Sequence, residues 1–363
     1  MTDTEAPAAD AVVERLFGEG IGLFHLLTVY LGQQAGLFAA LADRPGQTSA
    51  QLAAATKTDE RYVREWLQAE VIAGLVTADA EDLQTATFAL ADGVREALVD
   101  EVDPYYIGGL GYAAAAVANA LPTLATALRT GDGVPMSAYG PVVVRAQSEF
   151  NRPAFTNSLV SEWLPAMPDV FARLQDSATP ARVADIGCGT GWAAIELAKG
   201  LPFVTVDGYD SDELSIQTAN QNAADQGVND RVTFHLVDAA GDSPIPAASY
   251  DLVTYFECVH DMGRPAEALA AGRAAVRPDG TVLVMDERTN ESRPEPGDPV
   301  ETFFATVSVL WCLPQSRTTP DCEAPGTVMR PAQLAEFARR AGFSRVDVAP
   351  IEHPMFRFYR LVS

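Results

Sequence analysis

The spacing of apolar positions divides the chain into two regions of different character. From Val12 to Leu41 the apolar residues recur three and four positions apart, and Gly36 interrupts this pattern without a proline to end it. This spacing predicts one or two core helices. Thr48 or Ser49 then provides an N-cap for a short helix over residues 50–55.

The next segment predicts a helix followed by a hairpin. Asp59 is a good N-cap for a helix that Gly74 ends. Two short runs of strand-forming residues follow, Leu75–Thr77 and Thr85–Leu90, with a polar turn between them. Helix, turn, helix and hairpin together form the outline of a winged helix.

A winged helix that reads DNA needs basic side chains on its second helix. Residues 59–70 offer two arginines, Arg61 and Arg64, against four acidic side chains. We therefore expect this domain to dimerise and to enclose a substrate rather than to bind nucleic acid.

The domain boundary is expected near a break in the helical pattern. Ile107–Arg129 is alanine-rich and helix-prone, Gly131–Gly140 contains the glycines and prolines of a break, and Pro153–Leu174 is helical again. We place residues 1–150 in the winged-helix-like domain with its linker helices, and residues 151–363 in a second domain.

From Arg182 onward, short apolar runs alternate with amphipathic helices. The expected strands are residues 182–186, 203–209, 232–237 and 252–256, and the expected helices are residues 192–199 and 212–225. Strands that alternate with helices imply a parallel sheet covered on both faces. We therefore predict the α/β class, with a doubly wound, mostly parallel, Rossmann-like sheet.

Composition supports two globular domains and narrows the choice of partners. The 363 residues are 48% hydrophobic and 20% charged, and a formal net charge of −24 disfavours nonspecific binding to nucleic acid or to an anionic membrane.

The segment that comes nearest to a membrane span, Ile107–Leu128, is diluted by Gly, Ala, Asn and Pro. Met1–Asp10 lacks the basic start and apolar run of a secretory signal, so we expect a cytoplasmic protein. Four cysteines without CxxC spacing predict buried free thiols.

The strongest chemical signal is a glycine-rich loop after the first of these strands. Residues 183–191 read Val-Ala-Asp-Ile-Gly-Cys-Gly-Thr-Gly and open a helix. Glycines permit positive φ and let a ligand approach the bare backbone. The spacing is GxGxG rather than GxGxxG, and Asp185 lies two residues before the first glycine, where a carboxylate suits a cationic amino-acid moiety better than the pyrophosphate of NAD.

Acidic residues also end the next two strands. Asp210 could bind both hydroxyls of a ribose, and Asp238 could accept a hydrogen bond from an adenine amine. The alternative is that each aspartate only caps the following helix or turn. Three carboxylates at three successive strand ends, together with the glycines, favour a cofactor site.

These motifs resemble those of a known superfamily. The segments Asp185–Gly191, Gly208–Asp210, Val237–Ala239 and Arg277–Gly280 resemble the successive motifs of class I S-adenosylmethionine-dependent methyltransferases. With the winged-helix-like domain in front, the whole chain resembles two-domain small-molecule O-methyltransferases. The resemblance implies S-adenosylmethionine as cofactor, a small-molecule methyl acceptor and a homodimer.

The resemblance also implies which residues bind the cofactor. They lie in the glycine loop and after the next three strands: Asp185, Gly187, Cys188, Gly189, Asp210, Ser211, Asp238, Ala239 and Phe256.

Methyl transfer from a sulfonium is an in-line displacement, so the protein must hold the nucleophile and exclude water. A base is needed only if the nucleophile must lose a proton. The candidate base is His260, because it follows a strand on the rim where doubly wound sheets bind ligands, and because the resembling O-methyltransferases have their catalytic histidine in a comparable His-Asp pair. The alternative is a histidine that only hydrogen-bonds within its loop.

Asp286 or Glu287, at the end of the expected strand Thr281–Met285, could orient that imidazole, and we assign Asp286. The tryptophan that commonly follows the His-Asp pair in the family is replaced by Met262. An acceptor pocket is expected from three apolar side chains, Trp311, Phe303 and Met355.

Three other functions stay open at this point. A related group of methyltransferases methylates carbon beside a 2-oxo acid, and holds a metal with a His-Asp pair and a further histidine. Here the pair is His260 and Asp261. Residues 309–312 offer Cys312 but no histidine, so we predict no metal. A cofactor-sensing winged-helix regulator and a nicotinamide-dependent oxidoreductase are the other two. The acceptor, and whether oxygen, nitrogen or carbon receives the methyl group, are not specified by the sequence.

Overall fold

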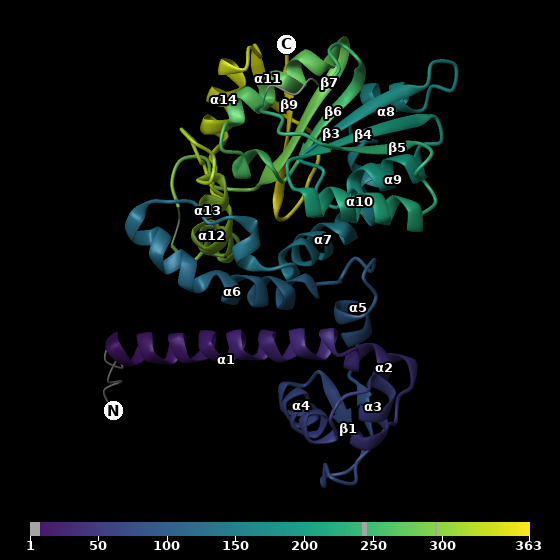
Figure 1. Ribbon diagram of the computed structural model, residues 1–363, viewed down its shortest axis with the longest axis vertical. Helices are drawn as coiled ribbons and strands as arrows, with labels where there is room; N and C mark the ends of the chain where they lie inside the picture. Colours follow the sequence, from purple (N-terminus) through teal and green to yellow (C-terminus); the bar gives the residue numbers. More distant parts are fainter. Residues whose placement is uncertain (1–7, 242–244, 295) are drawn as a thin grey trace, which may run out of the picture. The chain divides into compact units, whose positions relative to one another are not determined.

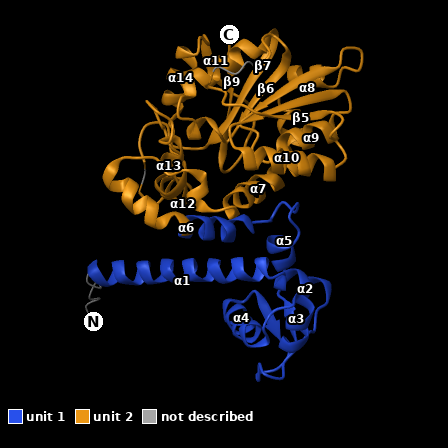
Figure 2. Ribbon diagram, in the orientation of Figure 1, with its two compact units in different colours: residues 1–118 blue, residues 119–363 orange. Residues whose placement is uncertain are grey.

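The computed structural model describes residues 8–241, 245–294 and 296–363, so most of the segment Met1–Asp10 lies outside the described residues. The chain divides into two compact units, residues 1–118 and 119–363 (Figure 2). The division falls within helix α6 (Gly109–Thr130), earlier than the boundary expected after residue 150. The expected boundary between residues 150 and 151 stays a prediction.

The first unit has the predicted order of helices and hairpin. Thr48 caps α3, where its side chain accepts from the Gln51 backbone N–H, and Asp59 caps α4 in the same way. Gly74 ends α4 at φ 81°, a conformation that favours glycine. The elements are α1 (Ala8–Gln34), α2 (Leu37–Asp43), α3 (Ser49–Thr56), α4 (Glu60–Ala73), β1 (Val76–Ala78), β2 (Phe88–Leu90) and α5 (Val94–Leu98).

The expectation that the first helices belong to the core is wrong for most of α1. Among its residues only Val29 and Gly32 are buried, whereas Leu23 and Leu31 are exposed. The core of this unit is built instead by α2, α3, α4 and the hairpin, around residues such as Phe38 and Leu67. Helical periodicity shows that a helix has an apolar side but does not show what covers it.

The second unit contains a seven-stranded sheet with the order β5-β4-β3-β6-β7-β9-β8 (Figure 1). The first five strands in this order are parallel, and β9 pairs antiparallel with both β7 and β8. The strands are β3 (Ala181–Ile186), β4 (Val204–Asp210), β5 (Val232–Leu236), β6 (Tyr250–Phe256), β7 (Val276–Glu287), β8 (Arg345–Val348) and β9 (Phe356–Val362). The predicted α/β class and mostly parallel sheet are confirmed.

Helices cover both faces of this sheet. One buried cluster joins the sheet to α8, α9 and α10, and a second joins it to α11 and α14. The helical elements are η1 (Met136–Tyr139), α7 (Val142–Ala154), η2 (Phe155–Trp163), α8 (Pro168–Leu174), α9 (Trp192–Gly200), α10 (Glu213–Asp225), η3 (Val259–Asp261), α11 (Pro265–Ala275), α12 (Pro299–Val307), η4 (Ser308–Cys312), α13 (Leu313–Ser316) and α14 (Pro331–Arg340). Because the parallel strands all end on one edge, the loops after β3, β4, β5 and β6 gather there.

Among the described residues, α6 is long and apolar enough to cross a membrane by length and composition, and the bent pair α1 and α2 meets the same criterion when taken together. The core helix of a soluble protein also meets it. The expected absence of a membrane span therefore stays a prediction.

Candidate functional site

The glycine loop connects β3 to α9 through three glycines at positive φ. Gly187, Gly189 and Gly191 have φ values of 75°, 51° and 83°. A Cβ on Gly191 would lie 2.4 Å from the ring of Phe234, whereas a Cβ on Gly189 would meet nothing within 4 Å. Packing therefore requires glycine at position 191, while the space beside Gly189 is open to a ligand.

Two buried thiols pack against this loop. A Cβ on Gly187 would lie 2.6 Å from Cys258 Sγ, and a Cβ on Gly208 would lie 3.0 Å from Cys188 Sγ. Burial raises the pKa of both thiols well above the ordinary value. Both cysteines are therefore neutral packing groups at physiological pH, and neither is bridged.

Asp185 ends β3 with a carboxylate that is only half satisfied. Its Oδ1 accepts from the Thr254 hydroxyl at 2.8 Å. Its Oδ2 is buried and has no hydrogen-bond partner among the described residues. Burial raises the pKa of Asp185 to about 7, and the negative charge of Asp210 acts in the same direction, while the hydrogen bond from Thr254 opposes both. A cationic ligand would satisfy the free oxygen and return the pKa toward its ordinary value.

Asp210 follows β4 and faces the same loop. Its two oxygens accept from the backbone N–H groups of Gly189, at 2.8 Å, and Asp212, at 2.9 Å. Burial raises the pKa of this carboxyl above its ordinary value. Each oxygen keeps a second lone pair for a ligand hydroxyl. Ser211, the next residue, is exposed.

The remaining predicted cofactor residues lie in different surroundings. Asp238 is largely exposed, and its oxygens accept from the Ala240 backbone N–H and from Arg264. Ala239 packs at the margin of the buried cluster beneath α11 and α14. Phe256 is buried, with its ring centroid 5.5 Å from that of Phe155. Asp185, Gly189 and Asp210 are therefore brought together by direct contacts or a shared loop, whereas Asp238 extends toward solvent.

His260 lies in the short helical turn η3 that follows β6, and its side chain is almost completely buried. Its Nδ1 donates to Asp286 Oδ1 at 2.8 Å, and Glu287 Oε2 lies 2.8 Å from the same nitrogen. Burial opposes protonation of the imidazole, but the negative charges of Glu287, Asp261 and Asp286 outweigh it and raise the pKa of His260 well above its ordinary value.

The two carboxyls beside His260 respond differently to burial. The pKa of Asp286 is lowered, because the adjacent His260 outweighs the effect of burial. The pKa of Glu287 is raised well above its ordinary value, because burial and the charge of Asp286 act in the same direction. Asp286 is therefore the more acidic of the two, and Glu287 adds a second carboxyl beside the same imidazole nitrogen.

Glu257 is a residue near this site that the sequence reasoning missed. It is half-buried after the end of β6 at φ 53°, and its buried Oε2 has no hydrogen-bond partner among the described residues. Burial raises its pKa to about 7, while His260 and a hydrogen bond from Asn151 act in the opposite direction. The sequence signal was a glutamate that directly follows the mostly apolar run Leu252–Phe256.

The three side chains expected to line an acceptor pocket lie in separate contacts. Phe303 stacks on Phe150 with centroids 6.0 Å apart, and Trp311 stacks on Tyr139 at 5.8 Å. Met355 packs against the cluster formed with α8, α9 and α10. The pocket stays a prediction.

Comparison with known families supports methyl transfer over the nicotinamide-dependent oxidoreductase. Residues 183–280 match the family described as a methyltransferase domain, and residues 24–98 match the Rv2258c-like winged HTH domain. The first match spans the glycine loop, Asp210, Asp238 and His260. This chain is an S-adenosylmethionine-dependent methyltransferase. The winged-helix outline is likewise confirmed as a winged helix-turn-helix domain.

Two relatives of this chain are themselves named methyltransferases. The ubiquinone biosynthesis O-methyltransferase of Hydrogenovibrio crunogenus is 29% identical over 182 residues, which cover 50% of this chain and 70% of that protein. The 27-O-demethylrifamycin SV methyltransferase of Amycolatopsis mediterranei is 35% identical over 105 residues, 29% of this chain and 38% of that one.

Solved structures share the fold of the whole methyltransferase. A putative O-methyltransferase from Nostoc punctiforme has a TM-score of 0.67 at 22% identity, with 99% of this chain and 100% of that chain covered. Human N-acetylserotonin methyltransferase, in complex with its cofactor, has a TM-score of 0.67 at 19% identity, with 100% and 99% covered. The cofactor of this methyltransferase is S-adenosylmethionine.

The glycine loop fits that cofactor. The free, buried Oδ2 of Asp185 suits an ammonium group, and the open space beside Gly189 suits a ligand that touches the backbone. Both features lie at the carboxyl edge of the parallel strands, where doubly wound sheets bind their ligands.

Proposed function

We propose that this methyltransferase transfers the methyl group to a hydroxyl of its small-molecule acceptor, with His260 as general base and Asp286 as the residue that orients it. One observation carries the proposal: a buried imidazole follows β6 at the ligand-binding edge, and its Nδ1 is held 2.8 Å from Asp286 Oδ1. An imidazole held at Nδ1 presents Nε2 as its proton acceptor.

The predicted residues would hold the cofactor in three groups. Asp185 would bind the amino group of the methionine moiety, while the backbone of Gly187, Cys188 and Gly189 would lie against the cofactor. Asp210, with Ser211, would bind the ribose hydroxyls. Asp238 and Ala239 would contact the adenine, with Phe256 at the floor of the site. S-adenosylmethionine supplies a methyl group already activated by a positively charged sulfur.

The charges around His260 support its role. When a base accepts the proton of a hydroxyl, the imidazole becomes an imidazolium. Asp286 beside Nδ1, with Glu287 and Asp261 nearby, stabilises that charged form, as the raised pKa of His260 indicates. Only the neutral imidazole can accept that proton, so the raised pKa of His260 means that the base is freed as the pH rises. Burial keeps water from competing for the acceptor's oxygen. The O-methyltransferase names among the relatives support oxygen as the methylated atom.

The test compares His260→Ala with a matched histidine variant, His235→Asn. His235 is half-exposed on β5 and lies 3.2 Å from Asp207, in a part of the sheet that the proposal does not use. With an acceptor found by screening, His260→Ala should lower kcat by about 10²- to 10⁴-fold while S-adenosylhomocysteine binding is kept. His235→Asn should change neither. An undiminished kcat in His260→Ala at every pH would refute the role of the base.

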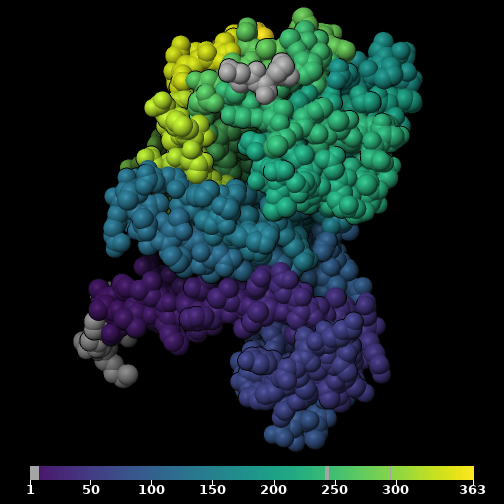
Figure 3. Space-filling view, in the orientation of Figure 1, coloured from purple at the N-terminus to yellow at the C-terminus, as the bar shows by residue number. Residues whose placement is uncertain are grey.

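We also propose that the protein functions as a homodimer. Eight large apolar side chains of α1 are exposed in a single chain: Val12, Val13, Leu16, Phe17, Ile21, Leu23, Phe24 and Leu31. They lie on a helix that is seen along its length as the purple surface in Figure 3. Apolar surface of this extent on one helix is typical of an interface with another chain.

A further inference from the structure

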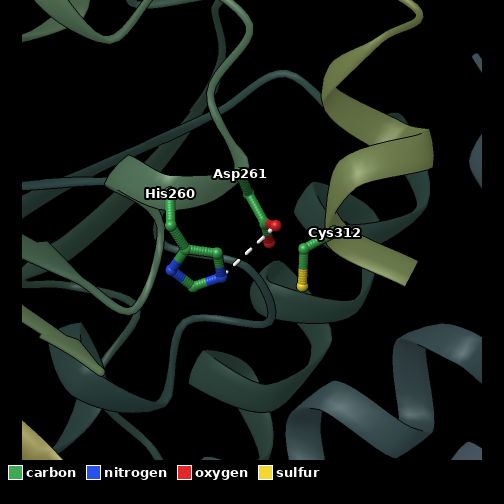
Figure 4. Close-up of side chains that lie close together, drawn as sticks. All are labelled: His260, Asp261 and Cys312. Carbon is green, nitrogen blue, oxygen red and sulfur yellow. Dashed lines mark ion pairs between the residues drawn. The ribbon is translucent and has the colours of Figure 1, made fainter. Parts of the chain in front are cut away.

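Three different metal-ligating atoms converge on the free side of His260. The ligand atoms of His260, Asp261 and Cys312 all lie within 4.8 Å of one another. Figure 4 shows the Asp261 carboxylate directed toward the imidazole and the Cys312 sulfur directed into the same space, with Cys312 coming from a different part of the chain. Both His260 and Cys312 are buried.

The Asp261 oxygen in this cluster forms an ion pair with His260 but has no hydrogen-bond donor among the described residues. Its Oδ1 lies 3.3 Å from His260 Nε2, but the geometry is not that of a hydrogen bond, and this buried oxygen has no hydrogen-bond partner among the described residues. A buried carboxylate oxygen without a donor is costly. A cation between Asp261, His260 Nε2 and Cys312 Sγ would satisfy it.

The other side of the imidazole is arranged as in known metal sites. Metal-ligating histidines almost always donate their second ring N–H to a carboxylate or carbonyl, which fixes the ring and the tautomer. His260 Nδ1 makes this contact with Asp286 Oδ1 at 2.8 Å. Nε2 is thereby the nitrogen that faces Asp261 and Cys312.

We propose that His260, Asp261 and Cys312 form a binding site for one zinc ion, and that zinc inhibits methyl transfer by occupying Nε2. Zinc accepts sulfur, imidazole nitrogen and carboxylate oxygen as ligands in one tetrahedral site, whereas magnesium and calcium prefer oxygen alone. Three protein ligands leave the fourth position to water. On binding, the Cys312 thiol and the Nε2–H of the imidazolium each give a proton to solvent, and the thiolate and the Nε2 lone pair go to the metal.

The local backbone supports a positioned sulfur. Cys312 ends η4 (Ser308–Cys312), a π-helical segment inserted between α12 and α13. Such segments occur rarely and are frequent at functional sites. The inserted turn brings a thiol from the segment after β7 to the imidazole that follows β6.

The two parts of this proposal rest on different grounds. Zinc binding rests only on the geometry of the three ligands. Inhibition also rests on the proposed function, because it requires Nε2 to be the atom that takes the acceptor's proton. Binding and activity must therefore be measured separately.

The binding experiment uses the full chain, stripped of metal with a chelator and titrated with Co²⁺ and then Zn²⁺. We expect one ion per chain, a thiolate-to-Co²⁺ charge-transfer band in the near ultraviolet, and loss of that band when Zn²⁺ displaces Co²⁺. Cys312→Ser should abolish the band, and both Cys312→Ser and Asp261→Asn should weaken zinc binding by about tenfold or more. Cys322→Ser, which changes a half-exposed cysteine outside the cluster, should leave the band and the affinity unchanged.

The activity experiment follows methyl transfer by the wild type while zinc is titrated. We expect inhibition with the same midpoint as binding, shifted to higher zinc in Cys312→Ser. No stoichiometric binding, or binding that Cys312→Ser does not weaken, would overturn the site. Binding with unchanged activity would overturn the inhibition, and activity that rises with zinc would overturn it in favour of metal-assisted methylation of carbon. A wild-type kcat in His260→Ala would instead refute the base while zinc binding stands.

Discussion

Asp185 and His260 are both buried ionisable groups, and their neighbours act on them in opposite ways. Asp185 has a neutral partner, the Thr254 hydroxyl, and burial raises its pKa to about 7. His260 has three carboxyls around it, and they overcome the effect of burial on the imidazole. The neighbour of Asp185 supplies no positive charge, which suits a cationic ligand at this carboxyl. The neighbours of His260 supply negative charge, which suits proton transfer to its imidazole.

The pKa of Asp185 predicts how cofactor binding depends on pH. In the free protein this carboxyl is half protonated near pH 7, whereas an ammonium ligand requires the ionised form. Affinity for S-adenosylhomocysteine should therefore rise with pH, by about tenfold between pH 6 and pH 8, and then level off. Calorimetry at several pH values measures this. Asp185→Asn should bind weakly with no such slope, and a flat profile in the wild type would contradict the assignment.

Single residues were predictable where the sequence pattern carried the chemistry. Asp185, Asp210 and His260 follow from their places after strands. Glu257 did not, because its position depends on contacts between segments that are distant in sequence. The sequence offered Asp286 or Glu287 as alternatives, and did not show that both carboxyls reach the imidazole.

At the scale of elements, the glycine loop combines two requirements. Gly191 must be glycine because its backbone has positive φ and because Phe234 occupies the place of a side chain. Gly189 shares the positive φ but faces open space. The same motif thus contains one glycine required by packing and one that leaves room for a ligand.

Gly191→Ala should destabilise the methyltransferase domain, by about 2 kcal/mol or more, because left-handed backbone strain adds to the overlap with Phe234. Gly189→Ala should cost about 1 kcal/mol from strain alone, yet it should weaken cofactor binding. Scanning calorimetry of the full chain, with and without S-adenosylhomocysteine, measures both. Equal melting temperatures for the two variants would contradict this division of roles.

Most elements could be predicted from apolar spacing and capping residues, including the α4 helix capped by Asp59. The antiparallel strands β8 and β9 were not identified, because β9 inserts between β7 and β8 and such pairing depends on the whole sheet. The π-helical segments η2 and η4 were also missed, since their sequences differ little from those of α-helices.

At the scale of the whole molecule, the exposed side of α1 is the feature that a single chain does not explain. Periodicity predicted the helix but wrongly placed it in a core, because apolar spacing looks the same for a core and for an interface between subunits. The acidic composition agrees with a small-molecule acceptor, although it does not specify which one.

The dimer proposal predicts that charge on α1 separates the subunits. The double variant Phe17→Glu, Phe24→Glu should be a folded monomer by light scattering, because burial of two carboxylates in an apolar interface is costly. Tyr62→Glu, at an equally exposed position on α4, should remain a dimer. A monomeric wild type at micromolar concentration would refute the proposal.

The thiols of Cys188 and Cys258, packed against the glycine loop, give the protein an internal reporter of its own motion. With raised pKa values and buried sulfurs, they should react with an alkylating reagent only when the loop opens. Their labelling rate, followed by mass spectrometry, should therefore measure how often the loop exposes its interior. Bound S-adenosylhomocysteine should slow the labelling of both cysteines, and the half-exposed Cys322 would serve as the internal standard for reagent reactivity.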